Sequence, residues 1–283
     1  MARPSPSEIP QEIVDEVIDL CSKDERTLIT CSLISRAWVY RARKYLFSTL
    51  ALTDKNLPTW HNVVVTLPKP NKGSRKQQLP PTSCPPSPSC APLSSYVTSL
   101  KLAPTYSQAM SGDFESALLR ASTHFSAFIN LYSLTLSAIS FVAFWGPQLK
   151  ACFGSFGETV RELRLLMCSL DWKVLSFLKL FTRLELLKLD GNAWTNTRLL
   201  KWASVLQEGP VLRNILIVSN FTDANIELFD YLSTTRVEYR TISLGYNTAS
   251  TFSPLNTMFA KCKDHLLALI LTAADSTTPA DGQ

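Results

Sequence analysis

Few residues in this chain have the type and spacing that catalysis or metal binding needs. The three histidines, His61, His124 and His265, are far apart, and none has a partner at the spacing of a metal site or catalytic triad. Only nine of the 283 residues are glycine, and no phosphate-binding glycine loop occurs. No paired carboxylates or activated cysteine stand out. We therefore expect no enzyme, with no catalytic residue, metal or cofactor.

Cysteine usage and the chain ends bear on location. The seven cysteines are an odd number without a CxxC pair, and Cys84 and Cys90 lack the further ligands that zinc needs. The first residues form no apolar leader, and Leu266–Ala274 is far shorter than the roughly 20 apolar residues of a membrane span. We expect reduced thiols in a soluble cytoplasmic or nuclear protein without a membrane partner.

The composition favours stacked elements over a charged surface. Apolar residues make up 46% of the chain and charged residues 18%, below the roughly 25% that is typical. This deficit suits a repeat fold, in which each unit stacks against its neighbours. The net charge of +5 is mild for this length, so nucleic-acid binding is not expected.

Helical spacing begins near the N-terminus. Ile13, Val17 and Leu20, separated by four and three residues, trace one face of a helix, and Pro10 fits its first position. A capping box of Ser22 and Glu25 would open a second helix. A third would carry Trp38, Ala42 and Tyr45 and end near 46–47. Such a short module has more large apolar residues than its own core can hide, which indicates an interface.

The same segment carries a specific set of motifs. They are an (L/I)P-x-E-(I/L) opening at Ile9, Pro10, Glu12 and Ile13, an acidic turn at Asp24, C-S-L-(V/I)-S-R-x-W at Cys31–Trp38, and a final R-x-x-L-F. With these marks Glu8 to Phe47 resembles an F-box, and is especially similar to that of the large F-box family of basidiomycete fungi. The family more often has Leu at the position of Ile9, a volume-conserving change. The alternative is an ordinary helical subdomain.

The resemblance implies docking to the Skp-type adaptor of a cullin–RING ubiquitin ligase. The residues that it assigns to this contact and its support are Ile9, Pro10, Ile13, Val17, Leu28, Leu33, Ile34 and Trp38. Some of these must form the core of the module itself, and the sequence does not divide the two sets.

A linker follows. No acidic residue occurs from Lys55 to Gly112, and Leu67–Leu93 holds eight of the 17 prolines. Proline at this density blocks helices and ladder pairing, so the segment is expected to be extended and mobile. Its basic residues leave phosphate, nucleic-acid or lipid binding open as an alternative role. We assign 1–50 to the F-box, 51–96 to a first strand and linker, 97–275 to repeats and 276–283 to a disordered tail.

Past the linker the pattern L-x-x-L-x-L recurs seven times, three times with an Asn three residues later that we expect to satisfy the turn after it. The middle apolar positions are Leu100, Leu134, Leu163, Leu187, Ile215, Ile242 and Leu269, and five of the six intervals lie within the 20–29 residues of leucine-rich repeats. This predicts an α/β fold, a leucine-rich-repeat solenoid of parallel strands. A non-repeat α/β domain is the alternative. Expected helices cover Phe114–Phe128, Phe141–Phe153, Trp172–Phe181 and Trp194–Leu206.

An F-box followed by leucine-rich repeats resembles the substrate-recognition subunits of ubiquitin ligases. The strand residues between the core positions would bind an unknown protein client, with Lys101, Arg164, Lys188 and Leu216 as candidates. Arg164 and Lys188 would lie side by side and favour an acidic client, unless Glu162 and Asp190 neutralise them. A scaffold that binds the adaptor outside ubiquitination is the alternative function.

Overall fold

The chain divides into two compact units. The helical unit comprises Met1–Leu50, Thr59–Thr98 and Ala127–Asn130, and the sheet unit comprises Ala51–Pro58, Ser99–Ser126 and Leu131–Gln283. The predicted mobile segment, apart from Pro92 and Leu93, and the predicted tail at 276–283 lie outside the described residues. The computed structural model describes residues 9–34, 36–60, 62, 92–105, 113–143, 146–171, 173–194, 212–221, 237–246, 256, 259–260 and 262–273.

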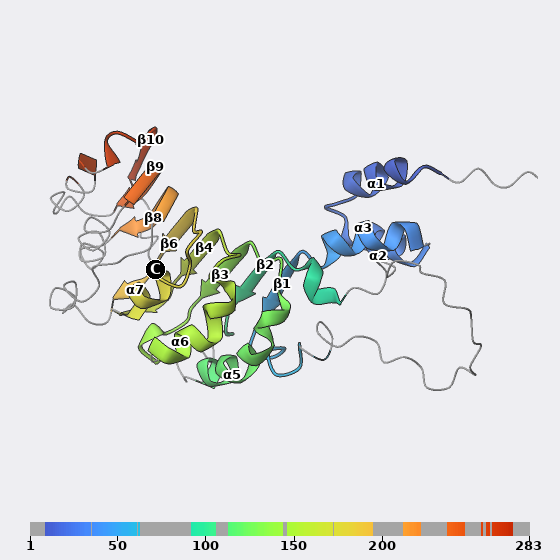
Figure 1. The fold of residues 1–283 in the computed structure, drawn as a ribbon, viewed down its shortest axis with the longest axis horizontal. Coiled ribbons are helices and arrows are strands. Elements are labelled where there is room, and N and C mark those ends of the chain that lie inside the picture. Colours follow the sequence, from blue (N-terminus) through green and yellow to red (C-terminus); the bar gives the residue numbers. More distant parts are fainter. Residues whose placement is uncertain are drawn as a thin grey trace, which may run out of the picture. The chain divides into compact units, whose positions relative to one another are not determined.

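Three helices begin the helical unit, as the apolar spacing predicts (Figure 1). They are α1 (Gln11–Leu20), α2 (Glu25–Ile34) and α3 (Arg36–Leu46), and a short 3-10 helix, η2 (Leu93–Tyr96), belongs to the same unit. Pro10 lies one residue earlier than expected, at the N-cap of α1, where its extended backbone leads into the helix.

The start of α2 corrects the predicted capping box. The Asp24 carboxylate accepts hydrogen bonds from the backbone N–H groups of Arg26 and Thr27, at 3.1 and 3.3 Å, and from the Thr27 hydroxyl at 2.6 Å. Asp24 directly precedes the helix and is therefore the N-cap, whereas Ser22 lies in the turn after α1. The capping box of Ser22 and Glu25 was wrong because the helix starts two residues later than that box requires.

The sheet unit is an α/β structure built on one eight-stranded parallel sheet. The strands follow in the order β1-β2-β3-β4-β6-β8-β9-β10. A separate parallel pair joins β5 (Ser169–Leu170) to β7 (Ala193–Trp194). The bounds of the eight strands are Thr49–Leu52, Ser99–Leu102, Ser133–Ser137, Glu162–Leu166, Leu186–Asp190, Leu212–Phe221, Val237–Tyr246 and Ala268–Ala273.

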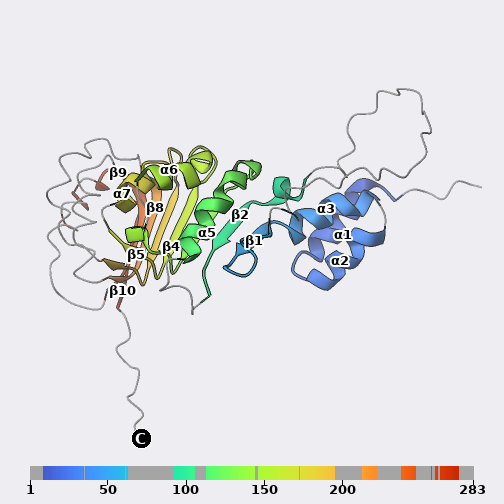
Figure 2. The same cartoon turned by 90° about the horizontal axis from the view of Figure 1, so that it is seen from below.

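The described helices of this unit lie along one face of the sheet (Figures 1 and 2). They are α5 (Asp113–Ala121), η3 (Ser122–Ala127), η4 (Phe141–Ala143), α6 (Gly146–Phe153), η5 (Gly154–Phe156) and α7 (Lys173–Leu178). Apart from η5, which follows the helix expected over Phe141–Phe153, they fall where helices were expected. Trp194 instead belongs to β7, and the rest of the helix expected over Trp194–Leu206 lies outside the described residues.

Two rows of aliphatic side chains cross the sheet in register. The first is Leu100, Leu134, Leu163, Leu187, Leu216, Ile242 and Leu269, and the second is Leu102, Leu136, Leu165, Leu189, Val218, Leu244 and Leu271. All are buried except the two leucines of β10, the last strand of the sheet. Alternation along each strand thus turns one apolar face toward the helices.

Phenylalanine rings from the connecting segments complete this core. Phe125 stacks on Phe156 with ring centroids 5.5 Å apart, and Phe153 meets Phe177 edge to face at 5.1 Å. Phe177 also contacts Phe181 at 5.0 Å. All five rings are buried, so aromatic contacts tie successive helices together behind the sheet.

Three neighbouring strands end in the same backbone bend. The residue directly after β3, β4 and β6 has a positive φ, 54° in Ala138, 53° in Met167 and 60° in Gly191. These residues follow strand ends that are paired across the sheet. Glycine adopts this left-handed backbone freely, whereas alanine and methionine do so at a cost.

Beyond the bend, side chains satisfy the backbone of the preceding strand. The Asn192 amide donates to the carbonyl oxygen of Leu165 at 3.0 Å, and its oxygen accepts from the N–H of Cys168 at 2.8 Å. One strand earlier, Cys168 Sγ donates to the carbonyl oxygen of Leu136, 3.4 Å away. Leu136 and Leu165 are paired in the sheet. Asn192 therefore bonds to the turn of the neighbouring strand, not to the turn after it.

The register of β8 differs by one residue from the predicted one. Leu187 pairs with Leu216, and Lys188 pairs with Ile217. Leu216 and Val218 are buried, so the core positions are not Ile215 and Ile217 as the spacing suggested. The segment from 215 to 218 is entirely apolar, so alternation could not decide which face each residue takes.

Candidate protein-docking surfaces

The helical unit has a small core of its own. Val14, Ile18, Leu28, Cys31 and Ala42 are buried in it. Trp38 packs partly buried against this cluster. Two of the residues predicted for the adaptor contact and its support, Leu28 and Trp38, thus belong to the core. The structure makes a division that the sequence left open.

The other predicted residues are exposed. On α1, Ile13, Val17 and Leu20 are exposed at spacings of four and three, which makes them one apolar stripe on the helix surface. Ile9, which is exposed two residues before the helix begins, is counted with this stripe. Pro10 is exposed beside it. On α2 an exposed cluster consists of Ile29, Leu33 and Ile34. The prediction had not included Leu20 and Ile29 in the contact, although their spacing from Val17 and Leu33 would have found them.

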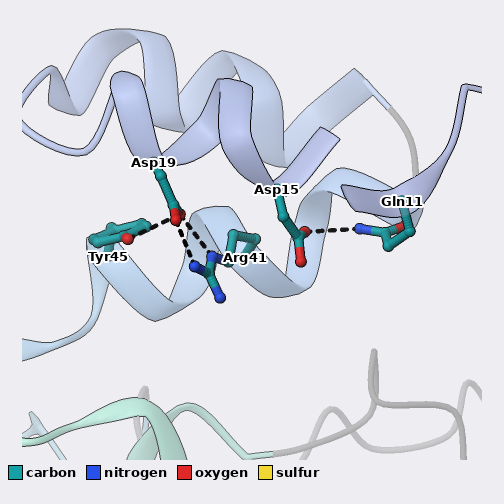
Figure 3. Close-up of polar contacts among 5 residues, drawn as sticks. All are labelled: Gln11, Asp15, Asp19, Arg41 and Tyr45. Carbon is teal, nitrogen blue, oxygen red and sulfur yellow. Dashed lines mark hydrogen bonds and ion pairs between the residues drawn. The ribbon is translucent and has the colours of Figure 1, made fainter. Parts of the chain in front are cut away.

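A polar network fastens α1 to α3 (Figure 3). Arg41 donates to both carboxylate oxygens of Asp19, from Nε at 2.7 Å and from Nη2 at 2.6 Å. The Tyr45 hydroxyl donates to the same carboxylate at 2.9 Å, and the Arg41 guanidinium lies 5.9 Å from the centre of the Tyr45 ring. A two-pronged contact of this kind fixes direction as well as distance.

This network shifts the titration of its members. The hydrogen bonds from Arg41 and Tyr45 lower the pKa of Asp19 to about 2, with the Arg41 charge adding to the effect. Hydrogen bonding to Asp19, together with burial, raises the pKa of Tyr45. The pKa of Arg41 is raised, chiefly by its hydrogen bonds to Asp19. The ion pair therefore persists throughout the neutral range.

The sheet unit offers the face that its helices leave open. The middle row of that face runs Lys101, Thr135, Arg164, Lys188, Ile217, Ser243 and Ile270 in register. Lys101 and Arg164 are exposed and Lys188 is half-buried. Leu216, the fourth predicted client residue, is 0% exposed. That assignment was wrong because of the β8 register, and Ile217 occupies the place in the row.

Both central cations of this row have a carboxylate partner. Arg164 and Lys188 lie opposite each other, as predicted. Arg164 Nη2 lies 3.2 Å from a carboxylate oxygen of Glu162, and Lys188 Nζ lies 3.9 Å from one of Asp190. The neutralised arrangement considered from the sequence is the one present. The centre of the open face is therefore a set of two ion pairs.

Metal ligands, thiols and membrane-spanning segments can be examined only among the described residues. Within them, no three His, Cys, Asp or Glu side chains come together as a metal site would need. Burial raises the pKa of the Cys168 thiol to about 11, which keeps it protonated. No helix in the described part of the chain has the length and apolarity to cross a membrane. His61, Cys84 and Cys90 lie outside the described residues.

Comparison with known proteins finds no match to this chain, either among models of protein families or among curated proteins.

Proposed function

We propose that this chain is the substrate-recognition adaptor of a Skp–cullin–F-box type ubiquitin ligase. The helical unit binds a Skp-type adaptor and, through it, the cullin–RING ligase. The sheet unit binds a protein client. The single observation that carries the proposal is the exposed apolar stripe, three of whose four residues are ones that the F-box resemblance assigns to the adaptor contact. It lies beside a core that does not include it.

A small helical unit gains nothing by itself from exposing these side chains. The stripe and the cluster on α2 together leave seven large aliphatic residues in contact with water. Contiguous apolar surface of this kind marks a protein interface. Covering it releases roughly 25 cal/mol for each Å² of apolar surface, which is the driving force of association.

We also propose that the sheet unit is a leucine-rich-repeat solenoid. The two aliphatic rows, the recurring bend after β3, β4 and β6, and the matching contacts of Cys168 and Asn192 support this reading. The spacing L-x-x-L-x-L-x-x-N/C-x-L, typical of such repeats, describes 184–194 with Trp at its last position and 160–170 with Val at its first. Solenoids bind partners with the strand face, which here carries Lys101, Arg164, Lys188 and Ile217.

The test is direct binding of the full chain to a recombinant fungal Skp-type adaptor. The variant Ile13→Asp/Val17→Asp places two charges in the stripe without touching the core. We expect it to lower affinity about 100-fold or more, because an unpaired charge would be buried in the complex. The control is Ile129→Asp, which places one charge at an equally exposed isoleucine, since Ile129 is 64% exposed, like Ile9 at 61%. It lies in the same unit outside the helices.

Equal binding by wild type and the Ile13→Asp/Val17→Asp variant would contradict the proposal. Co-purification then separates the functions. Cullin together with an unstable client, with cullin lost and the client retained in the double variant, fits a substrate receptor. Capture of the adaptor alone fits a scaffold, and salt-sensitive retention of nucleic acid or lipid fits the basic-linker alternative.

A further inference from the structure

The four acidic residues of α1 fall into two pairs with different surroundings. Asp19 is held by Arg41 and Tyr45, and Asp15 accepts a hydrogen bond from the Gln11 amide at 2.8 Å (Figure 3). Glu12 and Glu16 are exposed, and within the described part of the chain neither has a hydrogen bond or ion pair. The first pair stabilises the unit internally, and the second faces solvent.

Helix geometry places Glu12 and Glu16 along one side of the apolar stripe. Glu16 follows Ile13 by three residues and precedes Leu20 by four, so it neighbours both on the surface. Glu12 lies four residues before Glu16, one turn earlier on the same side of the helix. On its other side the stripe borders Val14 and Ile18, which are buried in the unit's core. The stripe therefore has one solvent-exposed edge, and that edge carries the carboxylates of Glu12 and Glu16.

The two glutamates are poorly explained by helix stability. They are four residues apart, about 6 Å along the axis, where like charges repel each other. Glu12 lies in the first turn and is favoured there by the helix dipole, but Glu16 lies beyond it. A carboxylate that destabilises its own helix is nevertheless useful at the rim of an interface, where it is matched by a cation of the partner.

We propose that Glu12 and Glu16 form an acidic edge that pairs with lysine or arginine along one side of the apolar groove receiving α1. The inference rests on the proposed function, and the groove is that of the Skp-type adaptor. The opposite edge of the stripe packs into the core of the helical unit, so only the edge with Glu12 and Glu16 can pair with charges of the groove. This pairing sets the orientation of α1 in the groove. It also accelerates the encounter of the two proteins at low ionic strength.

The test measures association rates of the full chain with the recombinant adaptor at two salt concentrations. Surface charges are weakly screened at about 20 mM salt and strongly screened at about 300 mM salt. For Glu12→Lys/Glu16→Lys we expect association at low salt to slow about tenfold and its salt dependence to shrink. Glu12→Gln/Glu16→Gln, which removes the repulsion in α1 and so keeps the helix, should give an intermediate rate. Far-ultraviolet circular dichroism checks that α1 stays folded in both.

The control Glu158→Lys/Asp264→Lys makes the same change in net charge at exposed acids of the sheet unit and should leave the rate within about twofold of wild type. Adaptor binding with an unchanged or faster rate in both glutamate variants would overturn this inference alone. A control that slows association as much as the lysine variant would also overturn it, because net charge would then be the cause. No binding by wild type at either salt would overturn the proposed function as well.

Discussion

Arg164 and Lys188 lie directly opposite each other on β4 and β6, yet each is paired with a carboxylate of its own strand, Glu162 and Asp190 respectively. Two cations that face each other across neighbouring strands repel, and the carboxylates offset this repulsion. An acidic client would have to compete with those ion pairs. Experiments on this face should therefore be compared at different ionic strengths.

Removing both carboxylates should expose the repulsion between the cations. We expect Glu162→Gln/Asp190→Asn to lower the free energy of unfolding by about 1 kcal/mol or less in dilute buffer, and to approach wild type as salt screens the pair. Urea unfolding at two salt concentrations measures this. Glu158→Gln, a neutralised exposed acid with no described partner, serves as the control. A loss that is equal at both salts would mean that the carboxylates act through packing.

The corrected register of β8 makes opposite predictions for two adjacent residues. Leu216→Ala should destabilise the sheet unit by about 2–5 kcal/mol, because it leaves a cavity between the sheet and the helices. Ile217→Ala should cost about 1 kcal/mol or less, because Ile217 faces the open side. Chemical denaturation of the two variants compares them directly. The reverse order would restore the register expected from spacing.

The left-handed bends predict that glycine is the more stabilising residue at each of these positions. Ala138→Gly should raise stability by up to about 1 kcal/mol, as relief of backbone strain exceeds the added chain entropy. Gly191→Ala should lower it by about 1 kcal/mol or more, because an alanine is strained at the φ of 60° that Gly191 adopts. Gly154→Ala is the control, with ordinary φ and its nearest neighbour at 3.8 Å. Thermal unfolding ranks the three, and a stabilised Gly191→Ala would contradict the assignment.

The Asp19–Arg41 pair should make the helical unit sensitive to acid. Since the folded-state pKa of Asp19 is lowered to about 2 from 3.8, its stabilisation is present above pH 4 and is lost as pH falls toward 2. Asp19→Asn should therefore be less stable than wild type at neutral pH, with a difference that shrinks over this window. Circular dichroism along a pH series tests it. A difference that stays constant down to pH 2 would show that the ionised carboxylate is not the cause.

Spacing predicted most of the architecture because burial imposes a period on the sequence. The steps of four and three that mark α1, and the alternating leucines of β3, β4 and β6, each have one face that must avoid water. The method failed at β8, where four successive apolar residues satisfy either register. It also failed at Ala138 and Met167. A left-handed backbone can be predicted from the sequence only where the residue is glycine, as at Gly191.

The candidate docking residues show a similar limit. Motif positions identified Ile9, Ile13 and Val17, but they could not separate these from Leu28, which has the same chemistry and is 2% exposed. The separation depends on how α1 and α2 rotate about their axes, which the contact between Asp19 and Arg41 helps to fix for α1. Asp19 and Arg41 are 22 positions apart in the sequence, so no local pattern predicts their contact.

The order of the strands also bears on how the chain folds. Each strand of the large sheet pairs with the one that follows it in the chain, apart from β5 and β7, which form their own pair. Apart from the long connection between β1 and β2, the loops closed between such neighbours are short compared with the whole chain. Folding can therefore begin at any of these adjacent pairs and spread in both directions. A destabilising substitution in β6 would then interrupt this spread and leave one partly folded segment on each side of β6. Unfolding is accordingly expected to proceed in stages, with the strands near β10, whose leucines are least covered, opening first.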